Sequence, residues 1–374
     1  MRNVVIAGYA RSPFHFAHKG DLRKVRPDEM AAQVIEALIQ RTGVPAQDLE
    51  DLIVGCAFPE GEQGFNVARL IGLLGHLPLS VGGATVNRFC GSSMQAIHMA
   101  AGAIQMNAGE AFVCAGIESM SRIPMGGYNP MPSPKLMSEM PAAYMSMGQT
   151  AENVARQYQI TRAEQEELAV VSHAKAAAAQ AAGKLDAEIV PIGSVSKDGC
   201  IRAGTSKEAL AGLKPAFIEE GTVTAGTSSP LTDGATAVLV TSEDYAKAHG
   251  LKVLAKIRSI AVAGCAPEVM GLGPIGASKK ALKRAGITSK DLDVVELNEA
   301  FSSQAIASMR DLDIPLEKVN LDGGALALGH PLGATGARIT GKAAALLKRE
   351  GKSLALATQC IGGGQGIATI LEAV

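Results

Sequence analysis

The chain is poor in several features that would point to particular classes of protein. It has no Trp, and aromatic residues make up only 3% of it, which argues against platforms that stack nucleic-acid bases or sugars. Lys and Arg number 35 against 36 Asp and Glu, so the basic excess typical of nucleic-acid binders is missing. No run of 18 or more apolar residues predicts a membrane span. The six Cys form no C-x-x-C pair, and His15 and His18 have no third ligand nearby. We therefore expect neither a disulfide framework nor a metal site.

What is present indicates a globular α/β enzyme. Of the 374 residues, 47% are hydrophobic and 42 are Gly, which allows a large core with closely packed elements. Short apolar strands alternate with helical stretches at both ends of the chain, which predicts mixed or parallel sheets covered by helices. The expected strands are residues 4–7, 51–55, 84–87, 111–115, 252–262, 294–297, 353–358 and 367–371. The expected helices are residues 27–40, 66–74, 91–107, 275–285, 300–310 and 333–348.

The middle of the chain has a different composition. Seven of the 14 Met fall between Met120 and Met147, and an Ala-rich helix that Thr161 is able to cap follows. Such a Met-rich segment suits a pliable apolar wall or a subunit contact, and equally a buried insertion. We predict an inserted domain at residues 121–230. It would separate an N-terminal half, residues 1–120 with 231–253, from a C-terminal half, residues 254–374.

Two segments of the chain echo each other. A strand leads into Cys90 and a Gly/Ser turn, and a later strand leads into Cys360 and a Gly-rich turn. Two such units in corresponding places would indicate a duplicated half-domain.

Cys90 is the first candidate for chemistry. It follows a strand and precedes a helix, and the partial positive charge of a helix N-terminus favours the thiolate. Backbone N–H groups in the same turn are able to stabilise an oxyanion. Cys90 is then a nucleophile, or else a small side chain of the core.

Three further residues are candidates to assist a thiol. His330 stands in a loop rich in Gly and Pro before a helix, where it is able to act as general base; alone, such a His is more often structural. Cys360 stands in a second glycine-rich turn with N–H groups available. Asn298 ends a strand and places its amide where it is able to hold a water molecule.

Together these segments resemble the signatures of the thiolases. The resemblance rests on residues 87–95, 329–333 and 360–364, with agreement at 298–301 and 221–226. It extends from Val4 to Ile370 and so covers nearly the whole chain. Any one motif is weak, whereas the combination is specific.

The resemblance implies an α/β fold of two similar βαβαβαββ halves, packed as a five-layered α-β-α-β-α sandwich with an inserted loop domain. It implies that Cys90 is acylated, that His330 activates it, and that Cys360 is the acid or base at C2 of the substrate. Asn298 would hold a water that forms one oxyanion hole with His330. The N–H groups of Cys90 and Gly362 would form the other.

The implied activity is reversible cleavage of 3-ketoacyl-CoA by coenzyme A, through an acyl-cysteine, to acetyl-CoA and a shortened acyl-CoA. Coenzyme A is then a co-substrate, and no permanently bound cofactor is expected. The positions that match CoA contacts of the family are Arg202, Phe217, Ser229, Met147, Ala300 and Phe301.

Departures from the family bear on chain length. Short-chain biosynthetic thiolases carry His-Met where this chain has Ser146-Met147, and Asn-Ala-Ser-Gly at residues 227–230, where this chain has Thr-Ser-Ser-Pro. The latter, with Gln365, favours the degradative 3-ketoacyl-CoA thiolases of fatty-acid β-oxidation. A short-chain acetoacetyl-CoA thiolase and a non-catalytic acyl-CoA or sterol carrier are the alternatives. A ketoacyl synthase would need a second catalytic His at position 360, and the Cys360 found there argues against that class.

We expect a cytoplasmic homodimer or homotetramer that binds acyl-CoA and CoA, with no nucleic acid and no transmembrane segment. A hydratase/dehydrogenase partner in a β-oxidation complex stays open, with residues 120–147 as the candidate surface. A disulfide between Cys90 and Cys360 also stays open, since it needs Cβ atoms within about 4.5 Å.

Overall fold

The N-terminal half alternates strands and helices around one sheet in a computed structural model, which describes residues 2–374. The strands and helices expected here from the sequence are all confirmed, most of them longer than predicted. In chain order the elements are β1 (Val4–Arg11), α1 (Pro27–Thr42), β3 (Leu49–Cys56), α2 (Val67–Leu74), β4 (Gly82–Val86), α3 (Ser92–Gln105), β5 (Ala111–Ser119) and β6 (Thr232–Ser242). The short β2 (His15–Phe16) pairs with β6.

The C-terminal half repeats this βαβαβαββ order with one change. After α8 (Glu243–Ala248), the elements are β7 (Ala255–Gly264), α9 (Gly273–Ala285), β8 (Val294–Leu297), α10 (Ser302–Leu312), α11 (Ala325–Leu328), α12 (Leu332–Glu350), β9 (Leu354–Ile361) and β10 (Gln365–Glu372). In the place of β4, the described residues form a single parallel bridge, between Val319 and Val295 of β8.

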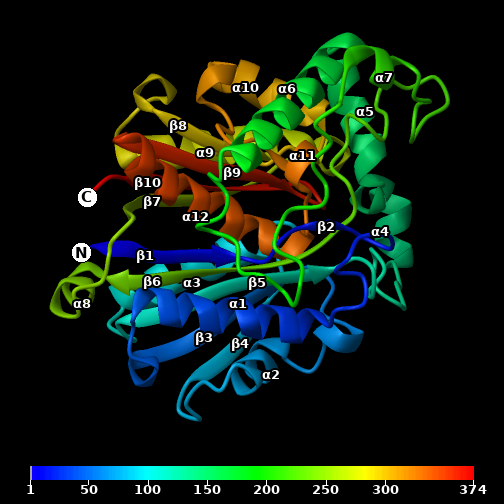
Figure 1. The fold of residues 1–374 in the computed structure, drawn as a ribbon. Helices are drawn as coiled ribbons and strands as arrows, with labels where there is room; N and C mark the ends of the chain where they lie inside the picture. Colours follow the sequence, from blue (N-terminus) through cyan, green and yellow to red (C-terminus); the bar gives the residue numbers. More distant parts are fainter. Residues whose placement is uncertain (1) are drawn as a thin grey trace.

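The strands follow one hydrogen-bonded path with an internal repeat. The order is β4-β3-β5-β6-β1 in the first half and β7-β10-β9-β8 in the second. The two halves are joined by only two residue pairs, Val5 with Lys256 and Ile6 with Ala255. The path therefore divides at β1 and β7 into two sheets, one above the other in Figure 1.

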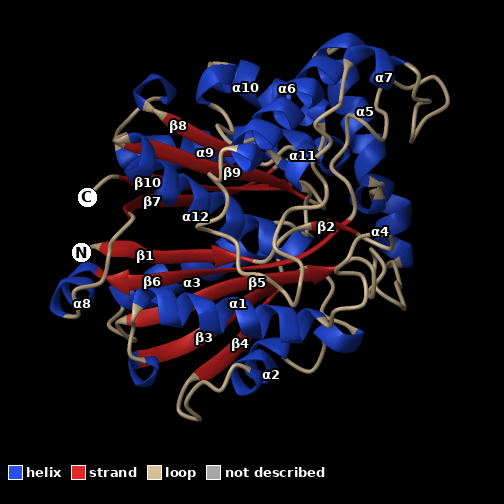
Figure 2. Cartoon of the chain, in the orientation of Figure 1, coloured by secondary structure: helices blue, strands red, loops and turns tan. Residues whose placement is uncertain are grey.

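The three largest apolar cores lie between the layers of a five-layered arrangement, as the family resemblance implied. In β6, Leu239 points to the core under α1 and α2, whereas Val238 points to the core that α3 and α12 share between the two sheets. This alternation follows from the two-residue period of a strand. A third core packs α9 and α10 on the outer face of the second sheet. Helices thus cover the strands on both outer faces and fill the space between the sheets (Figures 1 and 2).

The middle layer is held together by close contact between α3 and α12. A Cβ atom at Gly336 of α12 would lie 2.4 Å from the backbone nitrogen of Met94 in α3, and one at Gly116 of β5 would lie 2.3 Å from the carbonyl of Gly333. Only glycine permits this approach, which brings the N-terminal ends of α3 and α12 together. The loops that precede these two helices hold Cys90 and His330.

The duplication is confirmed, but the two cysteine turns do not occupy corresponding places in it. Cys90 lies between β4 and α3, whereas Cys360 lies near the end of β9, just before β10. The counterpart of the Cys90 loop is the loop of His330, because α12 corresponds to α3. The two cysteine turns look alike because both are glycine-rich, not because of the repeat.

The segment between β5 and β6 crosses from one half to the other. It contains α4 (Pro134–Glu139), α5 (Met147–Gln157), α6 (Arg162–Ala181) and α7 (Lys207–Ala211). Thr161 caps α6 in a capping box with Glu164, as predicted. Val154 of α5 and Leu168 of α6 belong to the core of the C-terminal half, beside α10 (Figure 1). We propose that residues 121–230 form the inserted domain, and these contacts pack it against the C-terminal half.

No helix among residues 2–374 is both long and apolar enough to cross a membrane.

A buried group of charges ties the inserted segment to both halves. The guanidinium of Arg11 in β1 is fully buried and donates to Asp198 at 2.7 Å and to Glu188 at 2.9 Å. Lys342 of α12 donates to the other oxygen of Glu188 at 2.9 Å. Because a buried charge is tolerated only when paired, this group fixes the chain before β6 against β1 and α12.

Arg11→Ala is therefore expected to lower the free energy of unfolding by about 3–5 kcal/mol, since Asp198 loses its buried cation. Urea denaturation followed by circular dichroism measures the change. Arg2→Ala is the control, because Arg2 pairs with Glu110 at the surface and its loss should hardly move the midpoint. Equal losses in the two variants would contradict a special role for the buried group.

Candidate active site

A cavity of about 180 Å³ lies where the loops before α3 and α12 meet the end of β9. Cys90, His330 and Cys360 all line it, although they are far apart in the sequence. The inserted segment contributes the start of α5 to the lining. The other lining residues are Met120, Met125, Ser146, Met147, Gly148, Phe217, Ser228, Ser229, Pro230, Leu231, Met270, Ala300, Phe301 and Leu332.

Cys90 is held in a tight turn at the head of α3. Phe89 before it has a φ of +43°, and the hydroxyl of Ser92 accepts from the N–H of Arg88 and donates to the carbonyl of Phe89. Gln359 of β9 donates its side-chain amide to the carbonyl of Cys90. The nucleophile candidate is thus fixed from both halves of the molecule.

The expectation that the helix N-terminus makes Cys90 a thiolate is wrong for this structure. Burial raises the pKa of Cys90 to about 11, and the nearby carboxylate of Glu118 adds to the increase. The N–H groups of Gly362 and of Cys90 itself lower the pKa, but burial outweighs them. Cys90 is a neutral thiol near pH 7. A base must take its proton when it reacts, and two N–H groups lie where an anion at this point is stabilised.

His330 is placed to be that base. The Thr335 hydroxyl donates to the carbonyl of Pro331 at 3.0 Å, so it accepts from Nδ1 of His330 at 2.6 Å. This assignment leaves Nε2 without a proton, and Asn298 donates its amide to Nε2 at 3.4 Å. Burial, with the charge of Arg338 nearby, lowers the pKa of His330 to about 3. The imidazole is neutral and therefore able to accept a proton at physiological pH.

Asn298 and Cys360 complete the polar part of the cavity region. Asn298 is fully buried, and its Oδ1 has no hydrogen-bond partner among the described residues, so an acceptor beside His330 is left for a small polar group. Cys360 is 1% exposed, and burial and the neighbouring Cys90 raise the pKa of its thiol well above the usual range. Two neutral thiols thus face one neutral imidazole.

The residues predicted to contact coenzyme A divide into two groups. Met147, Phe217, Ser229, Ala300 and Phe301 all line the cavity. The rings of Phe217 and Phe301 meet edge to face at 5.9 Å, and the N–H of Ser229 donates to the carbonyl of Ala300. Arg202 lies outside the cavity, exposed, with its guanidinium 4.9 Å from the ring centre of Phe16. A role for Arg202 stays a prediction for the outer end of a long ligand.

Sequence reasoning missed three residues that shape this site. Thr335 orients His330, and Gln359 binds the carbonyl of Cys90. Glu118 is buried at the end of β5 and accepts from the N–H groups of Ala57 and Gly333, so it joins the two halves behind the cavity. A Thr five residues after the His, in the first turn of the helix that follows, offered a weak signal for Thr335. The contacts of Gln359 and Glu118 run between distant segments, and the sequence carries no sign of them.

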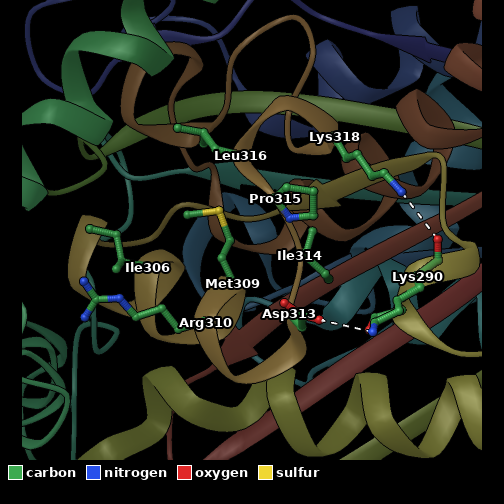
Figure 3. Close-up of a pocket in the computed structure, with 10 residues that line it drawn as sticks. Lys290, Ile306, Met309, Arg310, Asp313, Ile314, Pro315, Leu316 and Lys318 are labelled. Carbon is green, nitrogen blue, oxygen red and sulfur yellow. Dashed lines mark hydrogen bonds and ion pairs between the residues drawn. The ribbon is translucent and has the colours of Figure 1, made fainter.

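A wider hollow of about 540 Å³ lies elsewhere, along α10 and the loops beside it (Figure 3). Met309 and Ile314 form its apolar part, and Lys290 pairs with Asp313 at 4.0 Å across exposed side chains. It contains none of the predicted site residues. Size alone does not identify the functional cavity, whereas the chemistry of the lining does.

A half-buried thiol with two N–H groups at its sulfur, a neutral imidazole and a second thiol line one cavity, which makes it a candidate site for acyl transfer through a thioester. Residues 4–244 match the family description "Thiolase, N-terminal domain" and residues 251–373 match "Thiolase, C-terminal domain". The chain belongs to the thiolase family.

Relatives agree over the whole length of the chain. It is 45% identical over 389 residues to the "3-ketoacyl-CoA thiolase" of Bacillus subtilis (strain 168), with 100% of both chains covered. It is 46% identical over 386 residues to the "3-ketoacyl-CoA thiolase" of Marinomonas sp. (strain MWYL1), covering 100% of this chain and 98% of the other. The solved structure of the Bacillus anthracis acetyl-CoA acetyltransferase superposes with a TM-score of 0.92 at 39% identity, covering 100% of this chain and 99% of that one.

Proposed function

We propose that the protein cleaves 3-ketoacyl-CoA with coenzyme A to give acetyl-CoA and a shortened acyl-CoA, and that it catalyses the reverse condensation. The observation that carries the proposal is the convergence of Cys90, Cys360 and His330 in one cavity. Coenzyme A is a co-substrate, and the chemistry needs no permanently bound cofactor.

The first step is attack by the Cys90 sulfur on the C3 carbonyl of the substrate. Nε2 of His330 takes the thiol proton as the S–C bond forms, because neither group is charged beforehand. The N–H groups of Cys90 and Gly362 stabilise the oxyanion at C3. The bond between C2 and C3 then breaks and leaves an acyl-cysteine and the enolate of acetyl-CoA.

The second part of the reaction releases both products. Cys360 gives its proton to C2 of the enolate, whose oxygen is held by His330 and a water on Asn298. The thiol of the incoming coenzyme A gives up its proton to the Cys360 thiolate, and its sulfur takes the acyl group from Cys90. The Cys90 thiolate that leaves takes back the proton held by His330. The site returns to its starting state, and the concentrations of the four thioesters and thiols set the direction.

We propose a degradative enzyme of fatty-acid β-oxidation rather than a short-chain one. The 3-ketoacyl-CoA thiolases among its relatives and the residues Thr227-Ser228-Ser229-Pro230 support this choice. The cavity of about 180 Å³ is smaller than the roughly 300–1,000 Å³ of most ligand pockets and favours a short acyl group. Met120, Met125 and Met270 line it, however, and flexible Met side chains are able to make room. A short-chain acetoacetyl-CoA thiolase is the second candidate function, because the chain is also similar to an acetyl-CoA acetyltransferase.

Rates of thiolysis along a series of 3-ketoacyl-CoAs test this choice. We expect kcat/KM to rise from the four-carbon substrate to medium chains, because each added methylene gains apolar contact with the Met side chains, up to about fourfold per methylene. Turnover of acetoacetyl-CoA alone would assign the chain to the short-chain class. Binding of CoA esters without cleavage of any of them would favour the carrier alternative.

We also propose that the protein is a cytoplasmic homo-oligomer. All six cysteines are free within residues 2–374, as in proteins of reducing compartments. β4 pairs with β3 on one side and forms the edge of its sheet in the described part of the chain, with exposed Phe65 and Leu79 close by in sequence. An edge strand of this kind is able to pair with its own copy about a twofold axis. The exposed Met131 and Met140 support the surface at residues 120–147 as the one that would meet a β-oxidation partner.

A further inference from the structure

One face of α12 is polar although it is buried between the two sheets. Thr335, Arg338 and Lys342 follow one another on this face at helical spacing. Arg338 is 1% exposed, and Lys342 is 3% exposed. Charges so deep in a protein are expensive unless they are paired, so their partners matter.

Arg338 is only partly paired. Its Nη1 donates to Oε2 of Glu296 in β8 at 2.9 Å. Within residues 2–374, no partner exists for Nε and Nη2 of Arg338, for Oε1 of Glu296, or for the hydroxyl of Tyr9, and all of these atoms are buried. Internal water molecules usually satisfy such groups. The Arg338–Glu296 pair thus lies in a small polar region inside an otherwise apolar layer.

This polar region borders the active site. Thr335, whose hydroxyl accepts from Nδ1 of His330, lies three residues before Arg338 on the same face of α12. Asn298 follows directly after β8, two residues beyond Glu296. Asn298 donates to Nε2 of His330. The charge of Arg338 is close enough to His330 to lower the pKa of the imidazole. A positive charge therefore opposes the imidazolium that must form when His330 takes the proton of Cys90.

We propose that Glu296 is a positioning residue for the thiolase reaction: its carboxylate neutralises Arg338 and so keeps His330 basic enough to accept the proton of Cys90. Glu296 does not touch the substrate and acts through Arg338. The inference rests on the proposed function, in which His330 is the general base.

The charge of Glu296 changes in the range where the enzyme would be assayed. Burial raises the pKa of Glu296 to about 7, although Arg338 and Lys342 favour its charged form. The charged and titratable groups that interact with it are Arg338, Lys342, Lys175, Asp322, Glu188 and Tyr9. Below pH 7 Glu296 is mostly protonated, and His330 meets the full charge of Arg338. Above pH 7 the carboxylate is ionised and relieves this effect.

The test compares kcat/KM for thiolysis of a 3-ketoacyl-CoA in the wild type and in Glu296→Gln from about pH 5.5 to pH 9. Gln is a permanent mimic of the protonated acid. We expect a ratio of wild type to variant near 1 at the acid end and about 10 at the alkaline end, since one pKa unit in the base is worth up to tenfold. Glu110→Gln is the control, because Glu110 precedes β5 at the end opposite Glu118 and the cavity. Its ratio should not change with pH.

A ratio that stays constant with pH would overturn the proposal, because a merely structural loss lowers the rate at every pH. If Glu296→Gln does not fold, Glu296→Asp decides. The intrinsic pKa of Asp is lower than that of Glu, so the inflection in the plot of kcat/KM against pH should move to lower pH. An inflection that stays in place would show that another group titrates there. A wild type that cleaves no 3-ketoacyl-CoA would instead reject the proposed function, and the two failures are thereby distinguished.

Discussion

Cys90→Ala is expected to abolish thiolysis, with kcat/KM lower by about 10⁴-fold or more, because the proposed acyl intermediate forms on the Cys90 sulfur. Binding of the substrate should survive, since the apolar walls of the cavity are unchanged. Steady-state thiolysis and calorimetric titration with acetyl-CoA measure the two effects. Mass spectrometry of the wild type after incubation with acetyl-CoA should find the acetyl group on Cys90 alone.

Cys265→Ala is the matched control for this loss. Cys265 is half-buried and close enough to Cys360 to affect its pKa, but it does not line the cavity. Its removal should leave the rate nearly unchanged. If Cys90→Ala retained a substantial part of the activity, the nucleophile would have to be sought elsewhere.

Cys360→Ala is expected to separate the two halves of the reaction. Cleavage and condensation should fall by about 10²–10⁴-fold, because the proton at C2 has no donor or acceptor. Transfer of an acyl group between Cys90 and coenzyme A needs no proton at C2, and in exchange His330 is able to pass one proton between the two sulfur atoms. Exchange of labelled CoA into acetyl-CoA should therefore stay within about tenfold of the wild-type rate.

The comparison of the two cysteine variants makes this result decisive. Cys90→Ala should lose both cleavage and exchange, and Cys360→Ala only cleavage. Equal loss of both activities in Cys360→Ala would mean that Cys360 holds the cavity together rather than moving a proton. Unchanged thermal unfolding in both variants excludes a general loss of structure.

Most of the fold could be predicted from the hydrophobic pattern. Several strands, such as β1, β5 and β6, are fully buried, and their runs of apolar residues are visible without a structure. The spacing of Thr161 and Glu164, which is typical of a capping box, likewise predicts the start of α6. The pattern did not reveal that the counterpart of β4 shrinks to a bridge at Val319, because that depends on pairing with Val295. The sequence pattern also matched the turn of Cys90 with the turn of Cys360, whereas the structural counterpart of the Cys90 loop is the His330 loop. The error arose because glycine-rich turns around a cysteine look alike wherever they lie.

The site was predicted in its parts but not in its electrostatics. Cys90, His330 and Cys360 stand in recognisable turns, and the structure brings them into one cavity. From the helix N-terminus alone, Cys90 should be a thiolate. Burial reverses this, because removing the thiol from water costs more than the nearby N–H groups return. Burial is a property of the whole packed molecule, and no local motif carries it.

The sequence by itself determined the elements, the duplication and the residue types that perform the chemistry, because these follow from short-range patterns and from motifs a few residues long. Only the tertiary structure decided which groups meet and in what charge state. The glycine contacts of α12 set the separation between Cys90 and His330, and the pair of Glu296 and Arg338 places a buried charge behind the base. These contacts join segments that lie far apart in the chain. Their energies depend on burial, which exists only once both sheets have closed over the central helices.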